Sequence, residues 1–261
     1  MFFLKKIGTN NLKKNIFNIK KMKNIKNLIN SKKIGIIIFA RMSSKRYPGK
    51  VLKKIFNNKN IFEIIINNLK KENLHSKIII ATSNKKIDKK IVNFCKINNI
   101  NFFLGSHNNV FLRTKQCIKK YNLNYFVRIC ADRPFFDVSL MKKMIKLIFL
   151  KKVDIVTNAH PRTYPKGLTC EVAKTNIFKK INENELSQIE KEHIFNYFYK
   201  KKEYKIFNLK SKFNKNFLNK NFSLDKKKDI IDIKKIFSKF SKINKKINTN
   251  NLYKLSRRKV I

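Results

Sequence analysis

Side chains able to bind phosphate gather in the segment RMSSKRYPGK (41–50), directly after the apolar run IGIIIFA (34–40). The candidates are Arg41, Ser43, Ser44, Arg46 and Lys50. Guanidinium groups bind phosphate oxygens two at a time, and a lysine ammonium adds a compact, mobile charge. Hydroxyl groups and loop amides can donate further hydrogen bonds to the same anion. These residues predict a triphosphate-binding loop, although an exposed basic loop fits the spacing equally well.

Two aspartates follow short apolar runs and could hold a divalent cation. Asp132 comes after YFVRICA (125–131), and Asp225 ends the run FSLD (222–225). Mg²⁺ binds one or two protein carboxylates together with substrate phosphates, so a carboxylate just beyond a strand is a suitable ligand. Each aspartate could instead cap the following helix. Asp137 is a better cap than Asp132, which favours the metal role for Asp132, whereas the two interpretations of Asp225 stay level.

The segment HPRTYPKGLTCEV (160–172) has the composition of a substrate-facing loop. It combines two prolines and a glycine with three charged residues, Arg162, Lys166 and Glu171. An ordinary connection rich in turn residues explains the same composition, and the residue types alone favour that interpretation. His75 and His107 have no partners at the spacing of metal ligands.

The pattern from residue 34 to residue 158 predicts the elements that must position these side chains. Short β-branched runs alternate with longer amphipathic segments, which is typical of a mostly parallel, doubly wound α/β sheet. The predicted strands are 34–40, 77–82, 101–105, 125–131 and 153–158, and the predicted helices are 61–72, 86–98, 108–121 and 138–150. Ligands bind beyond the carboxyl ends of the strands in such sheets. The basic loop and Asp132 each follow one of these ends.

The second half of the chain is less regular. The pattern predicts strands at 168–174 and 222–225, and helices at 174–181, 187–200 and 227–240. Composition divides the chain into a basic low-complexity extension (1–33), expected to be disordered, a folded domain (34–240) and a frayed basic tail (241–261).

Net charge would normally indicate a nucleic-acid partner, because 63 Lys+Arg stand against 15 Asp+Glu, giving +48. The abundant lysines, asparagines and isoleucines and the scarce glycines and prolines instead indicate an AT-rich genome. The lysines are spread along the whole chain, which favours solvated faces over one binding patch.

Cysteine and hydrophobic patterns bear on where the protein works. The four cysteines show no C-x-x-C spacing, which favours free thiols in a reducing compartment and hence a cytoplasmic protein. No apolar run approaches the roughly 18 residues of a membrane span.

Several motifs together resemble one enzyme family. GIIIFARMSSKRYPGKVL is similar to the opening signature of the cytidylyltransferases that activate acidic sugars, such as acylneuraminate and 3-deoxy-manno-octulosonate. The further stretches, in the same order, are IIIATS, GSHNNVFLR, VRICADRPFFD, TYPKGLTCEV, KEHIFNYFY and FSLDKKKDI, and they resemble the spore-coat-polysaccharide-biosynthesis branch. The resemblance covers residues 34–240.

This resemblance implies a nucleotide-diphospho-sugar transferase fold of the glycosyltransferase-A type. It further implies CTP as donor, Mg²⁺ as cofactor and release of pyrophosphate when CMP passes to a sugar, expected to be acidic, for surface polysaccharide or glycan precursors. The implied catalytic residues are Arg41, Arg46, Lys50 and Asp132, and the implied nucleotide site is Ala40, Arg41, Ser43, Ser44, Lys50 and Asp132. Asp132 and Asp225 are the implied metal ligands, and Arg162, Lys166 and Glu171 are candidates for the sugar.

Two departures from the family pattern lead to a different hypothesis. Ser43 replaces a glycine beside the nucleotide, and Ala131 and Arg133 differ from the residues usual around the metal aspartate. Ser43 motivates one alternative, a catalytically degenerate member acting as a partner subunit, whereas Ala131 and Arg133 leave the branch of the family open. The net charge motivates another alternative, a basic nucleic-acid-binding protein. The resemblance itself implies a homodimer and no specific nucleic acid. The enzyme hypothesis requires the carboxyl groups of Asp132 and Asp225 to lie close to Lys50.

Overall fold

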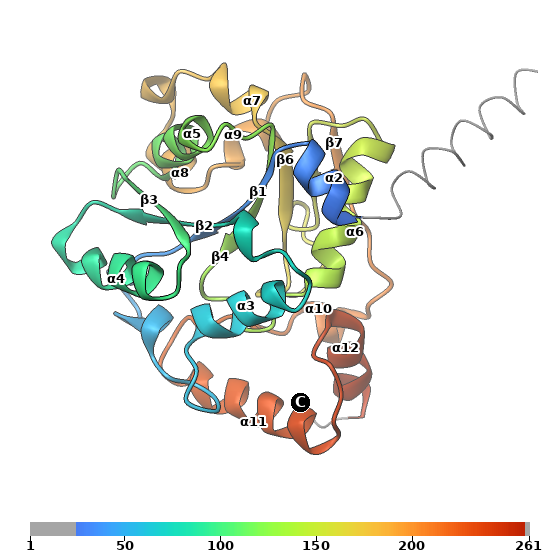
Figure 1. Ribbon diagram of the computed structural model, residues 1–261. Coiled ribbons are helices and arrows are strands. Elements are labelled where there is room, and N and C mark those ends of the chain that lie inside the picture. The colour runs from blue at the N-terminus through green and yellow to red at the C-terminus, as the bar shows by residue number, and fades with distance from the viewer. Residues whose placement is uncertain (1–24, 259–261) are drawn as a thin grey trace, which may run out of the picture.

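A seven-stranded sheet forms the centre of the protein in the computed structural model, which describes residues 25–258 (Figure 1). The strand order is β3-β2-β1-β4-β6-β5-β7. The strands are β1 Ile34–Phe39, β2 Ile78–Ser83, β3 Asn101–Gly105, β4 Tyr125–Cys130, β5 Ile155–Thr157, β6 Glu171–Lys174 and β7 Ile206–Asn208. Only β6 runs antiparallel to its neighbours, β4 and β5. The predicted mostly parallel, doubly wound α/β fold is confirmed.

Helices cover both faces of the sheet. They are α2 Ile25–Ser31, α3 Ile61–Lys70, α4 Lys89–Ile97, α5 Val110–Lys120, α6 Val138–Leu150, α7 Asn176–Lys179, α8 Gln188–Glu192, α9 Asn196–Tyr199, α10 Lys215–Leu218, α11 Asp229–Lys242 and α12 Thr249–Arg257. Side chains from α5, α7 and α9 pack in one core, and those from α2, α3, α4, α6, α11 and α12 pack in the other. None of the helices within residues 25–258 is long and apolar enough to cross a bilayer.

Strand β1 lies between the two cores because all six of its side chains are apolar or absent. Ile36 and Ile38 face one core, while Ile37 and Phe39 face the other. All residues of β1 are buried, as expected for a central strand of a parallel sheet. The chain therefore leaves β1 between the carboxyl ends of its two parallel neighbours, β2 and β4, and this is where the loop 40–50 begins.

Two local predictions in the second half are wrong, and one strand was not predicted. The helix predicted at 187–200 is two short helices, α8 and α9, because His193 has non-helical backbone angles (φ −106°, ψ 80°). FSLD (222–225) forms no strand, and its neighbour Asn221 makes only an isolated bridge to Lys166. Strand β7 had not been predicted, because its three residues carry no recognisable alternation.

The ordered part of the chain extends beyond both predicted limits of the folded domain, 34 and 240. Helix α2 buries Ile29, so the part of the extension from residue 25 is ordered, and residues 1–24 lie outside the described region. Helix α12 lies in the predicted frayed tail, where Leu252 and Leu255 join the core and Asn248 caps the helix. Apolar side chains at helical spacing outweigh the Lys/Asn-rich composition here.

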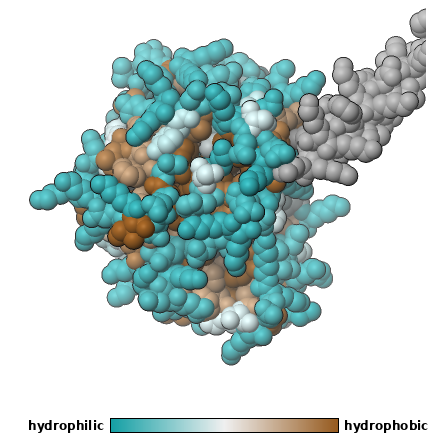
Figure 2. All heavy atoms as spheres, in the orientation of Figure 1, coloured by the Kyte–Doolittle hydropathy of each residue, from teal (hydrophilic) through white to brown (hydrophobic). Residues whose placement is uncertain are grey.

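The surface is polar over most of the face that Figure 2 shows, with small apolar patches between hydrophilic residues. All four cysteines are free thiols, as predicted, and three of them are buried. Burial raises the pKa of Cys95 and of Cys117 to about 12, so both thiols stay protonated near neutral pH.

Candidate active site

The loop after β1 folds back so that Lys50 lies beneath it. Gly49 has a left-handed conformation (φ 69°), and its amide donates to the Met42 carbonyl oxygen at 2.8 Å. This closure places Lys50 at the start of a short 3₁₀ helix, Lys50–Leu52. The side chain of Lys50 is only 10% exposed, so its charge must be balanced by nearby groups.

Two carboxylates balance the charge of Lys50. Its Nζ lies 3.3 Å from Asp132 Oδ2 and 3.7 Å from Asp225 Oδ1, and it donates to the Leu224 carbonyl oxygen at 2.5 Å. The Leu224 amide donates to the Asp132 carbonyl oxygen at 2.8 Å. This backbone link brings the segment before α11 to the end of β4, although the two aspartates are far apart in sequence. The geometric requirement of the enzyme hypothesis is therefore met.

The Asp225 carboxylate forms ion pairs with three cationic side chains. Its side chain is 6% exposed, and it pairs with Arg46 at 3.3 Å and with Lys166 as well as Lys50. Burial alone would raise the pKa of this carboxyl, but the Lys166 hydrogen bond and the charges of Lys166, Lys50 and Arg46 lower it overall. Asp225 is therefore ionised at neutral pH.

Gly167 determines where Lys166 lies. It has φ +90°, and a Cβ at this position would stand 2.4 Å from the backbone carbon of Phe222. The Phe222 amide donates to the Lys166 carbonyl oxygen at 2.8 Å, so the two segments touch backbone to backbone. The loop that carries Lys166 is thereby fixed against the segment that carries Asp225.

Gly167→Ala is expected to lower the free energy of unfolding by about 1–3 kcal/mol, because the added methyl group both clashes and disfavours the left-handed backbone. Chemical denaturation measures this change. Ser139→Ala, at an exposed position, should stay within about 0.5 kcal/mol of the parent. An unchanged stability for the Gly167 variant would contradict this account of the loop.

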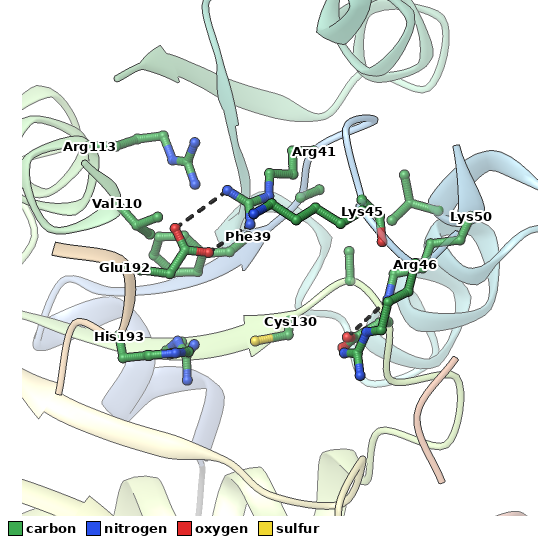
Figure 3. Close-up of a pocket in the computed structure, with 16 residues that line it drawn as sticks. Phe39, Arg41, Lys45, Arg46, Lys50, Val110, Arg113, Cys130, Glu192 and His193 are labelled. Carbon is green, nitrogen blue, oxygen red and sulfur yellow. Dashed lines mark hydrogen bonds and ion pairs between the residues drawn. The ribbon is translucent and has the colours of Figure 1, made fainter. Parts of the chain in front are cut away.

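A cavity of about 400 Å³ lies beyond the carboxyl ends of β1 and β4 (Figure 3). Six of the predicted site residues line it: Ala40, Arg41, Ser44, Arg46, Lys50 and Asp132. Further basic side chains, from Lys45, Arg113 and Arg128, line it as well. The lining is therefore strongly cationic, which suits a polyanionic ligand.

Five predicted site residues do not line this cavity. Asp225 adjoins it through its ion pairs with Arg46 and Lys50, which do line it. Lys166 pairs with Asp225, and it also lines a separate pocket together with the exposed Arg162. Glu171 is buried beneath the cavity and accepts two hydrogen bonds from Arg128 Nη1, each 3.2 Å long. The structure thus separates Glu171 from the other two residues predicted to bind the sugar.

Ser43, the fifth, belongs to a polar network behind the loop. Its hydroxyl lies 3.4 Å from His107 Nε2, and His107 Nδ1 lies 3.1 Å from the Ser83 hydroxyl. Ser83 donates to Asp88, which also accepts from the Met42 amide at 2.6 Å. The network begins and ends on the loop after β1, so Ser43, in place of the usual glycine, helps to tie that loop to β2.

Five basic or acidic residues of the cavity were not assigned to the site from the sequence: Lys45, Arg113, Arg128, Glu192 and His193. Arg41 pairs with Glu192, with Nη2 to Oε1 at 2.7 Å and Nη1 to Oε2 at 3.4 Å. His193 follows directly, at the break between α8 and α9. All five lie in stretches that carry the family resemblance, and that was the only signal that could have indicated them.

Comparison with protein families decides the relationship. A family model described as cytidylyltransferase matches residues 35–256. The chain belongs to the cytidylyltransferase family. The protein is therefore a member of a family of nucleotidyltransferase enzymes, as the sequence predicted. The match to the family model continues beyond residue 240, the predicted end of the domain, into α12.

Two relatives of this cytidylyltransferase match more than half of the chain. An uncharacterized protein of Methanocaldococcus jannaschii is 34% identical over 167 residues, which is 64% of this chain and 67% of that protein. The spore coat polysaccharide biosynthesis protein SpsF of Bacillus subtilis is 30% identical over 155 residues, which is 57% of this chain. The match covers 62% of the Bacillus protein, so less than two thirds of its length.

Solved structures share the fold. A cytidylyltransferase from Leptospira borgpetersenii has a TM-score of 0.73 and 26% identity, over 80% of this chain and 87% of that one. A CMP:2-keto-3-deoxy-manno-octonic acid synthetase complexed with CTP has a TM-score of 0.57 and 12% identity, over 79% of this chain and 99% of that one. The second likeness is one of fold alone.

Proposed function

We propose that this cytidylyltransferase transfers CMP from CTP to a sugar, expected to be acidic, and releases pyrophosphate, in the synthesis of surface polysaccharide or glycan precursors. The convergence of Asp132 and Asp225 on the Lys50 ammonium, within the cationic cavity, carries this proposal. The names of SpsF and of the CTP-bound synthetase support the choice of pathway and nucleotide.

The cationic side chains would bind the triphosphate and stabilise the leaving group. In this reaction a sugar hydroxyl attacks the α-phosphorus of CTP, the bond from that phosphorus to the bridging oxygen breaks, and pyrophosphate leaves. Arg46 and Lys50, which already contact carboxylates, would turn their donors to phosphate oxygens and offset the developing charge. Positioning and electrostatics inside the cavity therefore supply most of the acceleration.

Asp132 and Asp225 form a donor set that fits Mg²⁺ bound together with a nucleotide. Both carboxylates already share one cation, the Lys50 ammonium, which shows that they can converge on a single positive charge. No group of three or more metal-ligating side chains exists among the described residues, so phosphate oxygens must complete the coordination. When bound there, Mg²⁺ would neutralise charge on the phosphates.

A pyrophosphate-release screen tests the proposal. CTP, UTP, GTP and ATP are each offered with a panel of acidic and neutral sugars, with Mg²⁺ and with a chelator. We expect release to need CTP, an acidic sugar and the metal together. Release with no CTP preference, or none under any condition while CTP still binds, would contradict the proposal, and the second result would favour a degenerate partner subunit.

A further inference from the structure

Arg113 is a buried cation whose hydrogen-bonding capacity is largely unused. Its residue is 2% exposed, Nη1 donates to the Ser106 carbonyl oxygen at 3.1 Å, and Nε has no hydrogen-bond partner within residues 25–258. Burial lowers the pKa of Arg113 to about 10, helped by the charge of Arg41, so the group remains protonated at neutral pH. A buried guanidinium with free donors is costly unless a ligand satisfies them.

The local structure is built around this side chain. A Cβ on Gly105 would lie 2.7 Å from Arg113 Cγ, so one of the five glycines in the chain leaves the space in which the arginine stem packs. Asn109 caps helix α5 through the Leu112 amide at 2.8 Å, which fixes the first turn of the helix and thus the direction of Arg113. The position of the Arg113 side chain is therefore fixed by Gly105 and by the cap of helix α5.

Arg113 lies at the end of the cavity opposite Lys50 (Figure 3). The apolar side chains of Phe39 and Val110 line this end. Glu192, the acid drawn beside Arg113, is already paired with Arg41. An arginine beside apolar side chains, at the far end of the cavity from Arg46 and Lys50, suits a flat heteroaromatic ring with hydrogen-bond acceptors on its edge (Figure 3).

We propose that Arg113 recognises the pyrimidine base of the nucleotide and selects cytosine over uracil. This inference rests on the proposed function. Cytosine presents two adjacent acceptors, O2 and N3, which match the parallel N–H groups of the Arg113 fork. Uracil carries a hydrogen on N3, so its N3–H donor would face an N–H donor of Arg113 and no hydrogen bond could form between them. A site built to hydrogen-bond one edge discriminates strongly against a ring that lacks the matching atom.

A carboxylate of the acceptor sugar could use the same donors, and the test separates the two. The apolar walls favour the base, because a sugar acid presents hydroxyl groups to every side. If the base binds here, changes at Arg113 alter the ratio of CTP to UTP use. If the acceptor binds here, they alter the KM of the sugar and leave that ratio unchanged.

The experiment compares wild type, Arg113→Lys and Arg113→Gln, with kcat/KM measured for CTP and for UTP. We expect the CTP value to fall about 100-fold and the CTP/UTP ratio to fall at least about 10-fold. Binding of inorganic pyrophosphate should be unchanged. Lys45→Gln removes another cation from the same cavity and is expected to affect CTP and UTP equally. Equal losses for both nucleotides in the Arg113 variants would overturn the inference.

A substrate analogue tests the inference on the unmodified protein, in case the variants fail to fold. 3-Deaza-CTP has a C–H in place of the N3 acceptor. Wild type should use it at least about 10-fold less well than CTP, the scale of one lost hydrogen bond to a charged group. Equal use of the two would overturn the inference even though the enzyme is active. An enzyme that used no nucleotide at all would overturn the proposed function instead.

Discussion

Asp132→Asn is expected to lower the rate of pyrophosphate release from CTP and sugar by about 100-fold or more, the scale on which a preorganised transition-state contact is lost. The variant keeps the size of the side chain but removes its negative charge. The fold should be preserved, because the contact that joins the Asp132 segment to Leu224 uses backbone atoms only. Single-turnover kinetics with saturating CTP measure the effect on the chemical step.

A matched variant separates local charge from overall charge. Asp154 is also an ion-paired aspartate, but it bonds Lys174 at 2.9 Å on the other half of the sheet. Asp154→Asn should therefore leave the rate within about twofold of wild type, since it removes the same charge outside the cavity. Equal rates for Asp132→Asn and wild type would refute the metal and nucleotide assignment of Asp132.

The first five strands and the position of the basic loop at their carboxyl ends followed from short local patterns. A fully apolar run such as IGIIIFA has few alternatives to a central strand, and residues just past its end must lie at the carboxyl edge of the sheet. Arg41, Lys50 and Asp132 were predicted in that way to lie close together, and all three line the cavity. Asp225 could not be assigned from its local pattern alone, because an aspartate after a short apolar run could equally have capped a helix. The family resemblance was needed to favour the metal role.

The other cavity residues could not be derived locally. Arg113 and Glu192 come together only because α5 and α8 pack against each other, and helix packing is set by the whole core rather than by either segment. Helix α12 was missed for a related reason. A Lys/Asn-rich segment indicates disorder, yet Leu252 and Leu255 are buried in contact with distant parts of the chain. The roles of the site residues remain predictions until they are measured.

Lys50→Met is expected to have the second large effect, a loss of about 100-fold or more in kcat/KM for CTP. The ammonium is held by Asp132, Asp225 and the Leu224 carbonyl oxygen, so it lies where a triphosphate and its metal would meet the protein. Methionine fills a similar volume without charge. Steady-state kinetics over a range of CTP concentrations measure the loss, which should include a higher KM.

The control is Lys115→Met, because Lys115 is likewise bonded to a carbonyl oxygen and a carboxylate, those of Ile181 and Glu183, but outside the cavity. It should keep near-wild-type kinetics.

In the absence of nucleotide, the affinity of Lys50→Met for a divalent metal should rise although its catalytic activity falls. Removing Lys50 leaves two carboxylates with less positive charge around them, and a divalent cation can then replace the missing one. We therefore expect Mn²⁺ to bind Lys50→Met more tightly than wild type in calorimetry, although the variant is the poorer enzyme. Lower metal affinity together with lower activity would mean that Lys50 maintains the fold of the site, and that it does not occupy the position of a cation.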